Sequence, residues 1–154
     1  MRIAVAADHA GYSLKPLIAE ELASRGHDVI DLGTHDPDAP VDYPDFAEAA
    51  CQTLLGGNVE RAVLLCGSGI GVTIAANKFP GIRAGLCHET YSAHQGVEHD
   101  DMNVLCIGAR VVGPELARDI VAAFVTAQFS REDHRVRRLK KIEQIERRAL
   151  GRET

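Results

Sequence analysis

The sequence predicts an α/β protein in which a mainly parallel sheet is covered by helices on both faces. Short apolar runs that suit buried strands alternate with helical segments of ten to fifteen residues, an order that requires crossover connections. In such sheets, ligands bind at the carboxyl ends of the strands. The polar residues that fall near these ends, or on the connections leading from them, are Asp8, His9, Cys66, Ser68, His88 and His99. We therefore expect the sheet to bring them together.

The strands are predicted from short runs of aliphatic and β-branched residues, and the helices from longer periodic segments. In chain order, the expected elements are strand 2–7, helix 12–25, strand 27–32, loop 33–42, helix 46–55, strand 61–65, helix 70–78, strand 82–87, helix 90–97, strand 104–108, helix 114–128 and a last helix from the linker 130–133 to about residue 150. In the first helix, Ser13 is the candidate cap and Gly26 the stop signal.

The two C-terminal helices have different patterns. Segment 114–128 is amphipathic, and its predicted buried stripe consists of Leu116, Ile120, Phe124 and Ala127. The last helix carries an apolar residue every three positions, from Val136 to Ile145, among dense positive charge. This pattern leaves three interpretations open: a solvated helix packed by one stripe, a helix that docks on a partner chain, or a helix that places an Arg at an anionic group.

Length and composition favour one soluble domain over residues 1–154. The chain is 45% hydrophobic and 25% charged, and its net charge of -5 without a long basic run argues against a nucleic-acid partner. The four cysteines have no close pairing, which predicts reduced thiols and a cytoplasmic location. No apolar run approaches the roughly 20 residues that a membrane-spanning helix needs.

The segment with the most chemical information is C-G-S-G-I-G at residues 66–71, where an apolar strand stops in a glycine-rich turn before a helix. Glycines let the backbone direct its N–H groups toward one point, and the helix N-terminus adds its positive dipole end. Cys66 then offers a base or nucleophile, and Ser68 offers a hydroxyl for proton transfer. The alternative is a plain strand-to-helix turn with a buried structural cysteine.

Other chemistries fit less well. The turn after the first strand lacks the G-x-G-x-x-G of dinucleotide sites, and no Lys follows residues 66–71 as a Walker loop requires. Val72 stands where a C-x5-R phosphatase needs Arg. A metal site built from His88, His94, His99, Asp100 and Asp101 is conceivable, although its spacing matches no standard pattern. We interpret His94 and His27 as surface or capping residues, and Cys51, Cys87 and Cys106 as small core residues.

Six motifs carry a family resemblance. They are A-A-D-H-A-G at 6–11, D-Y-P at 42–44, C-G-S-G-I-G at 66–71, A-A-N-K-F-P-G-I-R-A at 75–84, N-V-L at 103–105 and G-A-R-V-V-G at 108–113. Through them, the chain resembles the B-type ribose-5-phosphate isomerase family, which includes galactose- and allose-phosphate isomerases. The resemblance implies a three-layer α/β/α domain with a five-stranded sheet in the order 2-1-3-5-4. It also implies dimers or tetramers whose sites lie between chains and whose C-terminal helix docks on the neighbour.

The same resemblance implies a reaction of the pentose phosphate pathway. Ribose 5-phosphate and ribulose 5-phosphate would interconvert through an enediolate, without a metal or cofactor. By position, Cys66 would move the proton between C1 and C2, Ser68 and Asp8 would exchange protons with the sugar oxygens, and His99 would open the ring. The implied substrate contacts are His9 and Arg137 at the phosphate, Gly67, Gly69, Ile70 and Gly71 at the enediolate oxygen, and Tyr43, Asn77, Asp100, Arg110 and His134 around them.

Two positions depart from the family pattern. Asp100 stands where the family usually has Asn, and Asp133 stands where it has a phosphate-binding Arg. A carboxylate near a phosphate dianion is repulsive. Either a neighbouring Arg compensates, or the substrate is another sugar phosphate, such as a tetrose phosphate (erythrulose phosphate) or a hexose phosphate (galactose or allose 6-phosphate). An alternative of another class is a non-catalytic phosphosugar-binding module.

Overall fold

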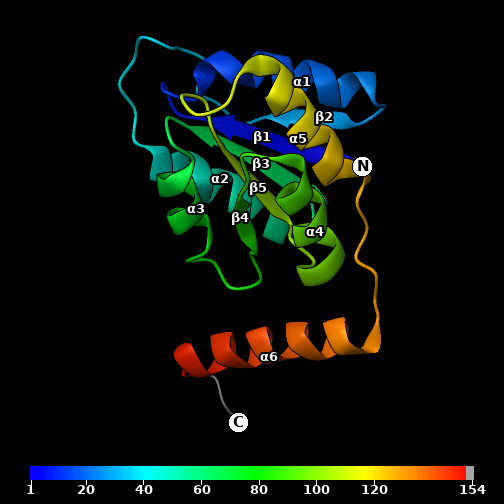
Figure 1. Cartoon of the computed structure of the whole chain (residues 1–154). Coiled ribbons are helices and arrows are strands. Elements are labelled where there is room, and N and C mark those ends of the chain that lie inside the picture. The colour runs from blue at the N-terminus through cyan, green and yellow to red at the C-terminus, as the bar shows by residue number, and fades with distance from the viewer. Residues whose placement is uncertain (152–154) are drawn as a thin grey trace.

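The expected parallel sheet is present in a computed structural model, which describes residues 1–151 of the chain (Figure 1). The elements are β1 (Arg2–Ala7), η1 (Tyr12–Leu14), α1 (Lys15–Ser24), β2 (Asp28–Asp31), α2 (Tyr43–Leu55), β3 (Arg61–Cys66), α3 (Ile70–Ala76), β4 (Ala84–Leu86), α4 (Thr90–Asp100), β5 (Val104–Gly108), α5 (Pro114–Thr126) and α6 (Asp133–Ala149). All strand pairs are parallel, in the order β2-β1-β3-β5-β4. This confirms the strand order that the resemblance implied.

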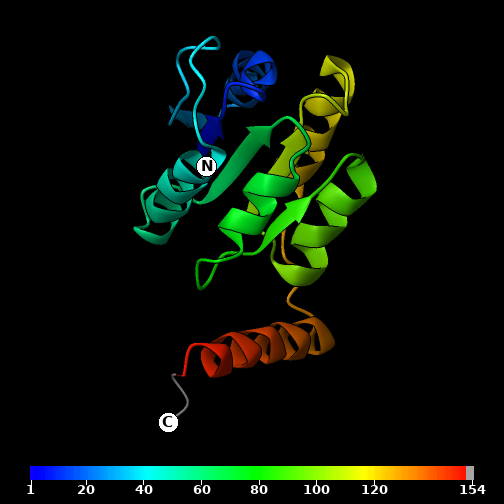
Figure 2. The ribbon, with the colours of Figure 1, turned by 90° about the vertical axis from the view of Figure 1, so that its left-hand side faces the viewer.

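Helices cover both faces of the sheet because alternate strand residues point to opposite sides. On one face, Ile3 and Val5 of β1 belong to an apolar cluster with residues of α1, α4 and α5, including the fully buried Phe124. On the other face, Ala4 and Ala6 belong to a cluster with α2 and α3. Figures 1 and 2 show these three layers from two directions. The predicted α/β/α architecture is therefore confirmed.

The sheet has two edges with different roles, because its strands all run in the same direction. At the carboxyl edge, the strands end and the next helices begin. At the amino edge, the helices end and the next strands begin. Each of α3, α4 and α5 therefore carries the chain from the carboxyl edge to the amino edge. The six residues of β3 separate the two edges by about 20 Å.

The last helix, α6, lies beneath the amino edge in both views (Figures 1 and 2). None of its residues is buried. The chain reaches it from the end of α5, where the Arg61 guanidinium donates to the carbonyl oxygens of Phe124 and Ala127. The guanidinium also lies 5.1 Å from the centre of the Phe124 ring, a cation–π contact. This capping fixes the point at which the linker to α6 begins.

Several element boundaries differ from the predictions. Helix α2 begins at Tyr43 rather than at residue 46, because Pro44 is well tolerated in a first helical turn. Helix α4 continues to Asp100 rather than stopping at 97. Ser13 caps nothing, because it lies within η1 and the start of α1 has no side-chain cap.

The predicted buried stripe of α5 is wrong at Leu116, which is 40% exposed. The buried face is centred one position later, on Ala117, Ile120, Val121 and Phe124. The small side chain of Ala117 lets the helix approach the sheet, and Leu116 lies on the flank of this face. Within the described part of the chain, no helix is long and apolar enough to cross a membrane.

We expect Phe124→Ala to lower the free energy of unfolding by about 3–5 kcal/mol, because it removes a fully buried ring and leaves a cavity. Leu116→Ala, on the same helix, is the matched control and should cost less than about 1 kcal/mol. Chemical denaturation at one fixed protein concentration measures both values. Equal losses for the two variants would contradict the assignment of the buried face.

Candidate active site

A cleft of about 420 Å³ opens at the carboxyl edge of the sheet. It is lined by residues from four separate connections, namely Asp8, Ala10, Tyr43, Cys66, Gly67, Ser68, Gly71, Arg110 and Val111. Seven of these nine were site candidates from the sequence, all except Ala10 and Val111. The parallel topology thus brings residues from positions 8 to 110 to one place.

The turn between β3 and α3 forms the floor of this cleft. Its conformation requires glycine at position 69, where φ is +79° and an added Cβ would overlap Leu86 and lie 3.0 Å from the backbone N of Gly108. The Gly69 N–H donates to Cys66 Sγ at 3.1 Å, and the Ile70 N–H donates to Ser68 Oγ at 3.3 Å. These two hydrogen bonds hold the Cys66 sulfur and the Ser68 hydroxyl in place at the floor of the cleft.

Three further N–H groups in the turn remain free. Within residues 1–151, the backbone N–H groups of Gly67, Ser68 and Gly71 have no hydrogen-bond acceptor. All three residues line the cleft. Unpaired amide donors next to a helix N-terminus stabilise negative charge on a ligand oxygen. The turn therefore provides a base and a set of oxyanion donors within a few residues of each other.

Asp8 is held rigidly beside this turn. Its side chain is 6% exposed, and Oδ1 accepts the N–H of Gly11 at 2.8 Å. Gly11 itself lies so close to β3 that an added Cβ would overlap the carbonyl oxygen of Leu65. This close approach brings the Asp8 loop against the end of the strand that carries Cys66.

Tyr43 and Arg110 form the walls of the cleft. The Tyr43 ring packs over Gly71, where an added Cβ would lie 2.8 Å from the ring. The Arg110 backbone N–H donates to the Gly67 carbonyl at 3.0 Å, and its side chain lies beside Gly67. The Arg110 guanidinium has no acidic partner among the described residues, so its charge is available to an anion in the cleft.

The other three thiols do not line the cleft. Burial raises the pKa of Cys51 and Cys87 to about 11 and that of Cys106 to about 12. These thiols stay protonated at neutral pH and lie among apolar side chains, as the sequence predicted. Cys66 is the cysteine that borders the cleft.

The remaining site candidates lie outside this cleft. His9 is exposed on the same loop as Asp8, and its Nδ1 accepts the Val41 N–H at 3.3 Å. Asn77 ends α3, where its amide pairs with both backbone groups of Ala84 at 2.9 Å. It therefore joins α3 to β4 at the amino edge of the sheet.

His99 and Asp100 also lie at the amino edge, because α4 crosses the sheet before it ends. His134 and Arg137 lie on α6, beneath that edge. About 20 Å of strand separates these four residues from Cys66, whereas proton transfer requires roughly 3 Å. The expectation that the sheet itself brings His99 to Cys66 is therefore wrong for a single chain.

The metal alternative receives no support from this arrangement. Across residues 1–151, no three His, Cys, Asp or Glu side chains are grouped as metal ligands. His94 is instead paired with Glu98 at 3.3 Å on the surface of α4, and His88 accepts the Gly108 N–H at 3.0 Å.

The chain is similar in sequence and in fold to proteins of one known family. The sequence pattern of the Ribose/Galactose Isomerase family matches residues 3–142. The chain belongs to this family. It is 46% identical over 145 residues to ribose-5-phosphate isomerase B of Escherichia coli, covering 93% of this chain and 97% of that protein. It is 43% identical over 131 residues to D-erythrulose-4-phosphate isomerase of Pectobacterium atrosepticum, covering 84% and 85%.

The solved structure of ribose-5-phosphate isomerase B from Clostridium thermocellum superposes with a TM-score of 0.93 at 44% identity, covering 97% of this chain and 99% of that one. The family resemblance drawn from the motifs is thus confirmed. As a member of the Ribose/Galactose Isomerase family, the chain is an aldose–ketose isomerase.

Sequence reasoning missed two glycines that shape the site of this isomerase. Gly11 permits the contact with Leu65, and Gly108 lies against Ser68, whose backbone carbon would be 2.6 Å from an added Cβ. Both glycines belong to motifs that carried the resemblance. Their role was not evident because close approach of two backbones leaves no signal beyond the glycine itself.

We expect Gly69→Ala to destabilise the protein by at least about 2 kcal/mol and to reduce turnover, because the positive φ and the overlap with Leu86 strain the turn. Gly67→Ala is the matched control, since its Cβ would meet Ala10 and Arg110 at an ordinary 3.5–3.6 Å. Thermal denaturation and sugar-phosphate turnover of both variants give the comparison. Normal stability of Gly69→Ala would contradict the described turn.

Proposed function

We propose that the chain interconverts D-ribose 5-phosphate and D-ribulose 5-phosphate with Cys66 as the catalytic base. The observation that carries the proposal is the cleft itself, in which a thiol with an N–H donor lies next to a carboxylate, a hydroxyl and unpaired amides. The similarity to the Escherichia coli ribose-5-phosphate isomerase B favours this substrate.

In the proposed reaction, the Cys66 thiolate removes the proton from C2 of the open-chain aldose. The C2–H electrons form the C1=C2 bond, and negative charge develops on O1. The free N–H groups of Gly67, Ser68 and Gly71 stabilise that charge, because a proton next to a carbonyl is acidic only when the resulting oxyanion is stabilised. Ser68 and Asp8 move the O2 proton to O1, and the Cys66 thiol returns its proton to C1.

The groups for ring opening and phosphate binding come, in this proposal, from a second copy of the chain. His99, Asp100, His134 and Arg137 lie at the amino edge, too far from Cys66 of their own chain. A dimer or tetramer that sets the amino edge of one copy against the carboxyl edge of another would complete the site. His9 would bind the phosphate from the chain that supplies Cys66, and Asn77 would approach the same site from the amino edge of the second copy.

Exposed apolar side chains favour this association. Near the carboxyl edge, Ile70, Ile74 and Val111 are more than half exposed. At the amino edge, α6 and the segment 82–87 border a largely apolar cavity of about 690 Å³ that includes Asn77 and Asp100. Apolar surface of this extent is typical of a protein–protein contact. Docking of α6 on a partner chain therefore remains our interpretation of the basic tail.

A second candidate substrate is another sugar phosphate, with the same chemistry. Asp100 and Asp133 add negative charge where the phosphate would bind, and the chain is also 43% identical to a D-erythrulose-4-phosphate isomerase. A tetrose or hexose phosphate would place its phosphate differently relative to these carboxylates. The four free cysteines suit a reducing, cytoplasmic setting for either reaction.

Turnover on a panel of four-, five- and six-carbon sugar phosphates, with Cys66→Ala beside wild type, tests the function. We expect ribose 5-phosphate to be preferred and Cys66→Ala to lose about 100- to 10,000-fold in kcat, because general-base catalysis by a positioned side chain contributes about that much. Substrate binding by the variant, measured by calorimetry, should change little. Preference for a tetrose or hexose phosphate would favour the second candidate, and binding without turnover by wild type would indicate a non-catalytic binder.

A further inference from the structure

Several polar contacts join α6 to the rest of its own chain, and none of the residues of this helix is buried. Near its start, Arg135 pairs with Glu98 of α4, with Nη1 and Oε1 3.7 Å apart. In the linker before α6, the Ser130 N–H donates to the Glu98 carbonyl at 3.0 Å. Near its end, the Glu146 carboxylate accepts the Gly81 N–H at 3.0 and 3.1 Å. Glu98 therefore contacts both the linker and the first turn of the helix.

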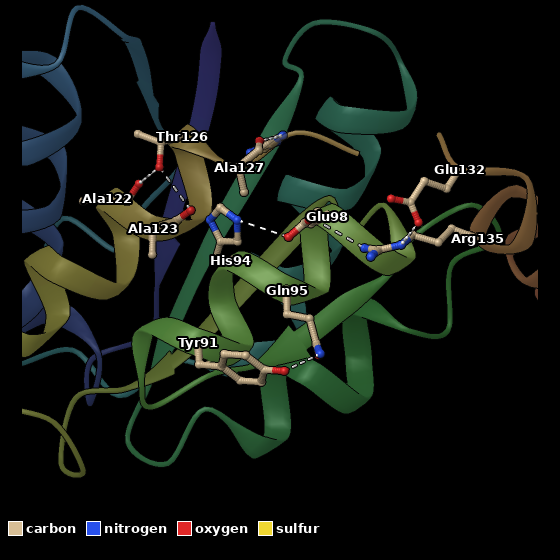
Figure 3. Close-up of polar contacts among 11 residues, drawn as sticks. Tyr91, His94, Gln95, Glu98, Ala122, Ala123, Thr126, Ala127, Glu132 and Arg135 are labelled. Atoms are coloured by element: carbon tan, nitrogen blue, oxygen red, sulfur yellow. Dashed lines mark hydrogen bonds and ion pairs between the residues drawn. The ribbon is translucent and has the colours of Figure 1, made fainter. Parts of the chain in front are cut away.

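The Glu98 carboxylate is the centre of this junction (Figure 3). One of its oxygens lies 3.3 Å from His94 Nε2, and the other faces Arg135. The Arg135 side chain is only 13% exposed, and its Nε donates to Glu132 Oε2 at 3.2 Å. The Arg135 guanidinium is thus mostly withdrawn from water between two carboxylates, and its Nη1 makes an ion pair with Glu98 but no hydrogen bond within residues 1–151.

The residues next to this pair are site candidates of the proposed reaction. Glu98 directly precedes His99, assigned to ring opening, and Arg135 stands two positions before Arg137, assigned to the phosphate. Because residues two apart in a helix point to opposite sides, Arg137 faces away from α4 when Arg135 faces it. Arg137 is exposed and lines a shallow hollow on the outer face of α6 with Lys140 and Lys141.

We propose that the Glu98–Arg135 ion pair positions Arg137 relative to His99 and thereby determines the length of sugar phosphate that the enzyme accepts. The proposal rests on the proposed function, in which His99 acts at the ring oxygen and Arg137 at the phosphate of one substrate molecule. The ring oxygen and the phosphate of the substrate are separated by its carbon chain. A fixed distance between α4 and α6 therefore selects one chain length.

Glu98→Gln and Arg135→Gln test the proposal, since each removes the charge and retains much of the side chain. We expect KM for the preferred sugar phosphate to rise about threefold to tenfold, the range for losing a partly buried ion pair, with kcat within about twofold. The ratio of kcat/KM between pentose and tetrose phosphates should fall by a similar factor. Inhibition by inorganic phosphate, which cannot span both groups, should change less than KM. The double variant should raise KM by no more than the single variant that has the larger rise, because both substitutions remove the same ion pair.

A second measurement does not depend on catalysis. Limited trypsin digestion should cleave after the exposed Arg131 several-fold faster in both variants than in wild type, because α6 is released from α4. Gln95→Ala is the matched control, since Gln95 lies on α4 but bonds Tyr91 Oη at 2.8 Å and does not reach α6 (Figure 3).

The outcomes separate the two proposals. Unchanged trypsin cleavage, or faster cleavage with an unchanged KM and pentose-to-tetrose ratio, would overturn the positioning role. Absence of turnover in wild type on the whole sugar panel would overturn the proposed function, and the positioning role with it. Retained turnover in wild type, with a raised KM and a reduced ratio in both variants, supports both proposals.

Discussion

The parallel direction of all five strands is the constraint on which the site depends. It places the ends of β1, β3 and β5 at one edge, so Asp8, Cys66 and Arg110 meet although about one hundred residues separate the first from the last. The same constraint sends every crossover helix to the opposite edge. A residue at the start of α4 lies near the cleft, whereas a residue at its end lies about 20 Å away.

In the proposed reaction, the two edges therefore supply different chemical groups. The carboxyl edge holds a thiol, a buried carboxylate, and amides and an Arg110 guanidinium that have no partner among residues 1–151, which together suit proton transfer next to a carbonyl. The amino edge holds a histidine and the basic helix α6, which suit ring opening and phosphate binding. Neither edge alone supplies all the groups that the proposed reaction uses. Pairing of two copies would bring the groups of one carboxyl edge to the groups of the other copy's amino edge. In our proposal, Glu98 and Arg135 fix the geometry of the groups at the amino edge.

Much of the fold was predictable from the sequence, because it follows from local patterns. The strands Arg2–Ala7 and Val104–Gly108 agree with prediction at both ends, since their apolar runs are uninterrupted. The start of α2 was placed too late because D-Y-P was interpreted as part of a loop. The stripe of α5 was misplaced at Leu116 because hydrophobicity was given more weight than the close packing that Ala117 permits.

The candidate site was predictable only in part. Of the candidates near strand ends, Asp8, Cys66 and Ser68 line the cleft, because parallel topology follows from the alternation of strands and helices, whereas His9 and His88 are not part of its lining. The pairing of the Asn77 amide with Ala84 was not predicted, because no periodicity reveals a contact between these two residues. His99 was grouped with Cys66 because it lies on the connection that leads from a strand end, although this connection returns to the amino edge before the next parallel strand begins.

Complementation between two inactive variants tests the central claim, a site shared by two chains, most directly. Cys66→Ala and His99→Ala proteins would be purified separately, then unfolded and refolded together, with mass spectrometry to verify hybrid dimers. A shared site predicts that the mixture regains about a quarter of wild-type turnover, because half of the dimers are hybrids and each hybrid has one intact site. Turnover that stays at the level of the separate variants, despite verified hybrids, would contradict the account.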